Sequence, residues 1–238
     1  MKIFGPVPSR RLGQSLGINI IPPKICSYSC VYCQLGRTKK MQLAREEFYK
    51  PAKIKKEVKK VLDRLEKKDE EVDYLTFVAD GEPTLDLNLG ESIKELKSLG
   101  VKTALISNSS LMADKKLREE LKELDWLSLK CDAVSEKIWR QVDRPHGRLD
   151  LEKIKKGMLN FSKSFSGELA TETMLIEGIN DRQVELEKIA DFVAELESDI
   201  SYIAIPTRPP AEEEVAGPDL EKINVAVQLF KEKGIKTE

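Results

Sequence analysis

The sequence has a single histidine, His146, and only four cysteines in 238 residues. Three of them, Cys26, Cys30 and Cys33, lie within eight residues of each other, whereas Cys131 stands alone. No second Cys-x-x-Cys or His-x-His pair is present to complete a structural zinc site, so zinc is the weaker alternative for these thiols. Disulfides are weaker still, because they staple small secreted domains that lack a core. An iron-sulfur cluster takes up to four thiolates, and three would leave one iron open to an outside ligand.

The sequence also lacks a long apolar run. The nearest to one in the N-terminal region is Gly17–Pro23, and it is too short for a membrane span or a signal sequence. We therefore expect a cytoplasmic protein that makes no membrane contact. The length is compatible with one large domain, and we expect a single domain over residues 1–238.

Net charge is nearly absent, at −1, but the charges are unevenly distributed. Residues 37–68 hold thirteen Lys or Arg against five acids, whereas residues 168–238 hold seventeen acids against seven bases. A basic face of this kind could bind nucleic acid. The alternative, which we favour, is a solvated exterior in a chain with 34% charged residues.

Apolar periodicity predicts helices that alternate with short β-rich runs. Residues 51–68 place Ile54, Val58 and Leu65 at helical spacing, and the strand 74–79 follows. The predicted strands are 16–21, 74–79, 102–107, 126–130, 169–176 and 202–205, and the predicted helices are 51–68, 89–99, 114–124, 151–161, 182–196 and 218–233. This alternation is typical of an α/β fold with a parallel sheet, either an open doubly wound sheet or a partial barrel.

Reactive residues in both architectures lie at the C-terminal ends of the strands. The three cysteines follow the first strand, on a loop of about residues 22–40, and Gly81 and Glu82 follow the second. Asn108 ends the third strand and Arg208 follows the sixth. Gly81, Glu82, Asn108 and Arg208 also each have a structural interpretation, as part of a turn, a helix cap or a surface loop.

The fourth strand separates its side chains by face. A period of two puts Ser128, Lys130 and Asp132 on one face, and Leu127, Leu129 and Cys131 on the other. Because the apolar face packs on helices, we expect Cys131 to be buried there and not to bind the metal. Lys130 then points into the interior or mouth, where a charge needs an anionic partner.

The run Cys-x3-Cys-x2-Cys, with Tyr32 before the last cysteine, resembles the signature of the radical S-adenosylmethionine (SAM) superfamily. Gly81-Glu82-Pro83 is similar to the Gly-Gly-Glu motif of that family, with Asp80 in place of the first Gly. Asn108 and Lys130 match segments at the ends of its third and fourth strands. The opening of the chain and the residues after Cys33 look most like small radical SAM proteins related to the wyosine-base tRNA enzymes, although the three further cysteines for a second cluster are absent.

The resemblance implies a partial (β/α)6 barrel and two cofactors, a [4Fe-4S] cluster and SAM. Cys26, Cys30 and Cys33 would bind the cluster, whose fourth iron would chelate the amino and carboxylate groups of SAM. Glu82 and the backbone near Gly81 would receive the SAM amino group, and Tyr32 would lie near the adenine. The further expected SAM contacts are Lys130 and Arg208 for the carboxylate, and Ser128 and Asn108 for the ribose.

The implied activity is reductive cleavage of SAM to a 5′-deoxyadenosyl radical, which abstracts hydrogen from a small molecule or an RNA nucleoside. The implied electron donor is a flavodoxin- or ferredoxin-like protein. Two alternatives stay open. One is an activase that places a radical on a partner protein, and the other is a non-enzymatic RNA-binding protein with a structural metal on its cysteines. No catalytic residue can be named from the sequence.

Overall fold

The computed structural model describes all 238 residues, and its main sheet has seven strands in the order β1-β2-β5-β6-β7-β8-β9. Neighbours from β2 onward are parallel, and β1 is antiparallel to β2. The strands are β1 (Lys2–Ser9), β2 (Gly13–Asn19), β5 (Tyr74–Phe77), β6 (Lys102–Ser107), β7 (Trp126–Lys130), β8 (Glu168–Met174) and β9 (Ile200–Ala204). A separate pair, β3 (Ile25–Cys26) and β4 (Lys40–Met41), brackets the cysteine loop.

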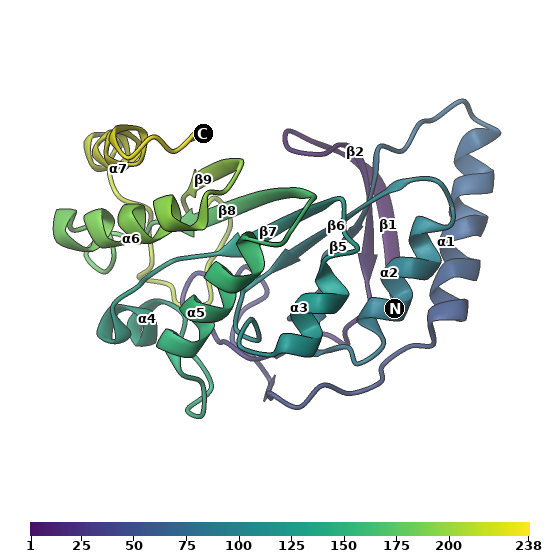
Figure 1. Ribbon diagram of the computed structural model, residues 1–238, viewed down its shortest axis with the longest axis horizontal. Coiled ribbons are helices and arrows are strands. Elements are labelled where there is room, and N and C mark those ends of the chain that lie inside the picture. Colours follow the sequence, from purple (N-terminus) through teal and green to yellow (C-terminus); the bar gives the residue numbers. More distant parts are fainter.

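Helices α1 to α6 connect successive parallel strands, and α7 follows the last strand; α1 lies at one end of the molecule, and α6 and α7 lie at the other (Figure 1). They are α1 (Pro51–Glu66), α2 (Leu89–Lys97), α3 (Lys115–Leu121), α4 (Glu136–Val142), α5 (Leu151–Ser162), α6 (Gln183–Leu196) and α7 (Leu220–Glu232), with a single 3-10 turn, η1, at Pro83–Leu85. No helix is both long and apolar enough to cross a membrane.

All seven helices pack on one face of the sheet. The main hydrophobic core joins buried side chains from every helix with Leu75, Leu105, Leu127 and Leu169 of the strands. The parallel strands also follow one another in chain order, whereas a doubly wound sheet reverses its order at a switch point. Of the two predicted alternatives, the doubly wound sheet and the partial barrel, the fold is therefore the partial barrel.

The concave face of the sheet is closed by the tip of the β1–β2 hairpin. Leu12, at this tip, packs in a second apolar cluster with Trp126, Ala170 and Tyr202 from the inner faces of β7, β8 and β9. The Arg11 guanidinium lies over the Tyr202 ring, 3.9 Å from its centroid. The hairpin thus plugs the inside of the partial barrel.

All six predicted strands and all six predicted helices are present, with bounds shifted by a few residues at most. Strand β1, helix α4 and the β3–β4 pair were not predicted from the sequence. The alternation of apolar and polar residues that marks a strand is interrupted in β1 by two prolines and a glycine. A register shift between Phe4 and Val7 accommodates them in the pairing with β2. Helix α4 is only seven residues long, too short for the apolar period to stand out.

Gly157 of α5 shows how closely the helices approach the strand connections. A Cβ at this position would lie 2.0 Å from the backbone oxygen of Met112. Ala favours a helix over Gly by about 1 kcal/mol, but moving two backbone segments apart costs more than that. We expect Gly157→Ala to destabilise the fold by at least about 2 kcal/mol in urea unfolding.

Gly147→Ala is the matched control, because Gly147 is exposed and nothing lies within 4 Å of the place that a Cβ would take there. Equal stabilities of the two variants would contradict this packing.

Candidate functional site

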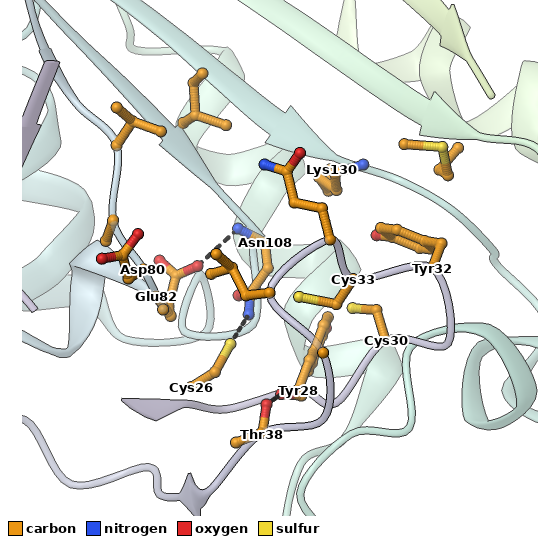
Figure 2. Close-up of a pocket in the computed structure, with 18 of the residues that line it drawn as sticks. Cys26, Tyr28, Cys30, Tyr32, Cys33, Thr38, Asp80, Glu82, Asn108 and Lys130 are labelled. Carbon is orange, nitrogen blue, oxygen red and sulfur yellow. Dashed lines mark hydrogen bonds between the residues drawn. The ribbon is translucent and has the colours of Figure 1, made fainter. Parts of the chain in front are cut away.

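A cavity of about 310 Å³ opens at the C-terminal ends of the parallel strands. Its wall includes all three clustered cysteines, and Figure 2 shows Cys30 and Cys33 on the loop that faces Asn108 and Lys130. Of the residues predicted to bind a cofactor, Tyr32, Gly81, Glu82, Asn108, Lys130 and Arg208 also line it. Residues that are far apart in the sequence therefore meet in one site at the strand ends.

The three thiols line the cavity from one loop and are not gathered closely enough to hold a single metal ion. Burial raises the pKa of the Cys26 thiol to about 12, and the Glu82 carboxylate adds to the rise. Burial also raises the pKa of the Cys30 thiol, whose Sγ lies 3.3 Å from Oδ1 of Asp143. Both thiols are neutral at pH 7 unless a metal's charge stands beside them.

Glu82 is the buried anchor of the site, at 1% exposure. Its Oε1 accepts from the backbone N–H and hydroxyl of Thr84 at 3.0 and 2.6 Å, and from the Ser107 hydroxyl at 2.8 Å. Its Oε2 accepts from the backbone N–H of Asn108 at 2.8 Å. Burial raises the pKa of this carboxyl, and these hydrogen bonds partly offset the rise. The side chain thus ties the end of β5 to the end of β6, a role that was not predicted from the sequence.

Gly81 is required by the close approach of a neighbouring segment. Its φ is not in the left-handed region, so no special backbone shape demands glycine. A Cβ there would lie 1.9 Å from the carbonyl oxygen of Ile25, which accepts a 3.1 Å hydrogen bond from the backbone N–H of Glu82. Gly81 therefore lets the start of the cysteine loop dock directly on the end of β5.

Asn108 points at the cysteine loop. Its side-chain amide donates to the sulfur of Cys26 at 3.4 Å (Figure 2). The same amide donates to the Ser27 hydroxyl at 3.0 Å, and its Oδ1 accepts from the backbone N–H of Ser110. The ribose contact expected of Asn108 stays a prediction, and in this structure its amide holds the first cysteine. Hydrogen bonds to a ligand sulfur of this kind tune iron-sulfur clusters.

Lys130 has the anionic partner that the strand pattern required, but that partner comes from the protein. Its Nζ lies 2.8 Å from Oε1 of Glu172 on β8 and 3.8 Å from Oδ1 of Asp132. Arg11 also pairs with Glu172. Burial would raise the pKa of Glu172, but the charges of Lys130 and Arg11 outweigh it and lower the pKa to about 2. Glu172 was not among the predicted site residues, although it alternates with Leu169 and Thr171 as an inward residue of the predicted strand.

Tyr32 connects this charged group to the cysteine loop. Its hydroxyl donates to the carboxylate of Asp132, and the Lys130 ammonium lies 4.7 Å from the centre of its ring. The ring thus has one face against a cation, at the edge of the cavity.

Ser128 is not brought to the cavity. It is fully buried on the inner face of β7, two residues before Lys130, and its hydroxyl has no hydrogen-bond partner. Two residues along a strand span about 6–7 Å, which is why it misses the mouth. Cys131 is 5% exposed in the main core beside Leu129, as the strand pattern predicted.

The loop after β9 is fastened to the cysteine loop. Glu212, only 7% exposed, accepts from Arg37 through Nε at 2.8 Å and Nη2 at 2.7 Å, and it also pairs with Arg144. The hydrogen bonds from Arg37 have the largest effect on the pKa of Glu212, and together with those from Arg144 they lower it to about 2. The backbone N–H of Glu212 donates to Val31, and Arg208 donates to the side chain of Gln34 at 2.8 Å.

Comparison with known families bears directly on this site. The model of the radical SAM superfamily matches residues 20–193, which include the cysteine loop and the elements from β3 to most of α6. The chain belongs to the radical SAM superfamily. Among curated relatives, a UPF0026 protein of Methanocaldococcus jannaschii is 47% identical over 229 residues, which are 96% of this chain and 71% of that protein.

Two solved structures share the fold of this radical SAM chain. A radical SAM methyltransferase from Sphaerobacter thermophilus is 14% identical at a TM-score of 0.66, over 94% of this chain and 65% of the other. TYW1 with a lysine-pyruvate adduct bound is 18% identical at a TM-score of 0.65, over 92% and 73%.

The donor set fits the cluster that this superfamily implies. Three thiols line one cavity, and the fourth cysteine is packed in the core, so the chain offers three thiolate ligands there and no more. Each cysteine of a [4Fe-4S] cluster binds a different iron, which suits thiols that line one cavity but are not gathered around a single ion.

The charge on Glu172 is the first test of the site. Glu172→Gln leaves Lys130 and Arg11 without their shared anion, and we expect a loss of about 3 kcal/mol at pH 7 in urea unfolding. Because the pKa of Glu172 is lowered from 4.5 to about 2 in the folded protein, its charge stabilises the fold fully at pH values above 4.5. This contribution disappears as the pH falls toward about 2. The difference between wild type and variant should shrink over that range.

Glu168→Gln, an exposed change on the same strand, should have little effect at any pH. A difference between wild type and Glu172→Gln that stays constant from pH 7 to below pH 4 would show that the charge is not the cause.

The Glu212 contacts are tested by hydrogen exchange. Glu212→Gln removes the charge that Arg37 and Arg144 share, and we expect severalfold faster amide exchange in residues 206–217 and 31–37. The exposed neighbour Glu213→Gln is the control and should exchange as wild type does. Unchanged protection in Glu212→Gln would mean that the ion pairs do not fasten this loop.

Proposed function

We propose that this protein is a radical SAM enzyme with Cys26, Cys30 and Cys33 as ligands of a [4Fe-4S] cluster. The bound cluster and SAM would together supply a 5′-deoxyadenosyl radical for hydrogen abstraction from an organic substrate. The observation that carries the proposal is that three thiols and the matched residues of the family motifs line one cavity at the strand ends.

The residues of the chain would then act mainly by positioning. Asn108 holds Cys26 through its amide, and Glu82 fixes the backbone of Asn108. Oε2 of Glu82 accepts only that one hydrogen bond, so it keeps capacity to accept from the amino group of SAM. Tyr32 offers an aromatic face to the adenine, and Lys130 holds the ring from its other side.

An external reductant is part of the proposal, because each reductive cleavage of SAM consumes one electron that must come from outside the protein. A flavodoxin- or ferredoxin-like protein would supply the electron. The substrate class stays wide, a small molecule or an RNA nucleoside. The likeness to TYW1 supports the fold and does not narrow that class, because the two chains are only 18% identical.

The basic segment 37–68 gives the RNA-binding alternative little support. Seven of its thirteen cations are within 4 Å of an acid: Arg37, Lys40, Arg45, Lys55, Lys59, Lys60 and Lys68. Charges that are neutralised within the protein attract phosphates less, so the surface resembles a solvated exterior more than a nucleic-acid footprint.

Anaerobic reconstitution tests the proposal. The wild type should bind about four irons per chain, and dithionite with SAM should yield 5′-deoxyadenosine. Alanine at Cys26, Cys30 or Cys33 should abolish both results. Cys131→Ala is the matched control and should keep both, because that thiol is packed in the core.

A colourless protein that holds one zinc, or an iron-loaded protein that needs Cys131, would contradict the proposal.

A further inference from the structure

Six charged side chains line the cavity: Lys24, Asp80, Glu82, Lys130, Glu172 and Arg208. Their partners within the protein decide which of them can bind a substrate. Glu82 accepts four hydrogen bonds, and Glu172 faces both Lys130 and Arg11. Asp80 accepts from the Asn19 amide at 2.8 Å. Every acid of the wall therefore has at least one partner within the protein, and the capacity left on Oε2 of Glu82 is the one proposed for the SAM amino group.

Lys130 is also occupied, since Glu172 and Asp132 neutralise it and Tyr32 covers it. Burial disfavours its charge, yet the two carboxylates hold the pKa of Lys130 above its ordinary value. The charge of this lysine is therefore already compensated within the wall, so it attracts a further anion less than a cation that has no acid beside it.

Lys24 and Arg208 differ from Lys130 in having no acid within 4.0 Å. The Lys24 ammonium makes no hydrogen bond and lies beside Gly36, 3.0 Å from the place of a Cβ there. Arg208 makes one side-chain hydrogen bond, to Gln34, which leaves four of its five N–H donors free. The two cations thus lie along one short turn, residues 34–36, at the rim of the cavity.

The backbone at both positions is fixed. Lys24 has a left-handed φ of 63°, which is rare for a residue with a side chain. Its backbone N–H donates to the backbone carbonyl of Asp80 at 2.6 Å, and its own carbonyl accepts from the backbone N–H groups of Lys39 and Lys40. Arg208 lies among Pro206, Pro209 and Pro210, whose rings restrict the loop. Strain and rigidity that hold two unpaired cations over a cavity are typical of a preorganised binding site.

We propose that Lys24 and Arg208 bind an anionic oxoacid group, a carboxylate or a phosphate, of a small-molecule substrate. Arg208 presents a planar fork that matches the oxygens of either group, and Lys24 adds a point charge. The inference rests on the proposed function, because it assigns the substrate of the same cavity. It also moves Arg208 from the SAM carboxylate to the substrate, since Arg208 follows β9 whereas the motif residues Gly81, Glu82 and Asn108 follow β5 and β6.

Calorimetric titration of the reconstituted protein with inorganic phosphate, and separately with acetate, tests the site. We expect saturable binding of one or both, and the stronger of the two identifies the oxoacid. Lys24→Met and Arg208→Met should each weaken that binding by about tenfold, as expected for one charged hydrogen-bonding partner. Lys39→Met and Arg148→Met are the matched controls, exposed cations that make no ion pair and do not line the cavity.

No saturable binding in the wild type would overturn the inference, as would equal losses in the controls. A loss of SAM affinity in Arg208→Met would return that residue to SAM and overturn it too. If the protein binds an RNA oligonucleotide through Lys24 and Arg208 but does not bind the small anions, the ligand of the site is RNA, and the small-molecule assignment is wrong.

Different results would contradict the proposed function and the proposed substrate site. Anion titration requires no SAM cleavage, so a wild type that binds phosphate or acetate at these residues but yields no 5′-deoxyadenosine contradicts only the radical chemistry. A wild type that cleaves SAM but binds anions equally well without Lys24 and Arg208 contradicts only the substrate site.

Discussion

The buried carboxylate of Glu82 is the interaction on which the site depends. It joins two strand ends, because it accepts from Thr84 after β5 and from Ser107 and Asn108 at the end of β6. Its own backbone N–H holds Ile25 at the start of the cysteine loop. An unsatisfied carboxylate at 1% exposure would be strongly unfavourable, so these donors are needed by the fold as much as by the cavity. Glu82 thus links both strand ends to the start of the cysteine loop.

A second set of charges shapes the interior. Arg11, Glu172, Lys130 and Asp132 alternate in sign from the hairpin tip to the mouth of the barrel, and each buried charge is offset by its neighbour. This arrangement explains why a lysine can lie on the inner face of a strand. It also confines the free positive charge of the cavity to the rim, at Lys24 and Arg208, where a ligand can reach it.

Much of this was predictable from the sequence, because hydrophobic period reflects burial directly. The six parallel strands, the helices between them and the burial of Cys131 all follow from which residues must avoid water. The partners of polar side chains did not follow, since they depend on register between strands. Lys130 clearly needed an anion, but only the pairing of β7 with β8 places Glu172 opposite it. Likewise Asn108 reaches Cys26, and Ser128 stays below the cavity, through geometry that no local pattern encodes.

The central claim is that three thiolates hold a cluster with one iron left open to SAM. Mössbauer spectroscopy of protein reconstituted with iron-57 tests it most directly, with spectra recorded before and after SAM is added. We expect a [4Fe-4S] spectrum in which SAM changes the signal of one iron and leaves the other three as they were. A spectrum that SAM leaves unchanged, or a protein that assembles no cluster on Cys26, Cys30 and Cys33, would contradict the claim.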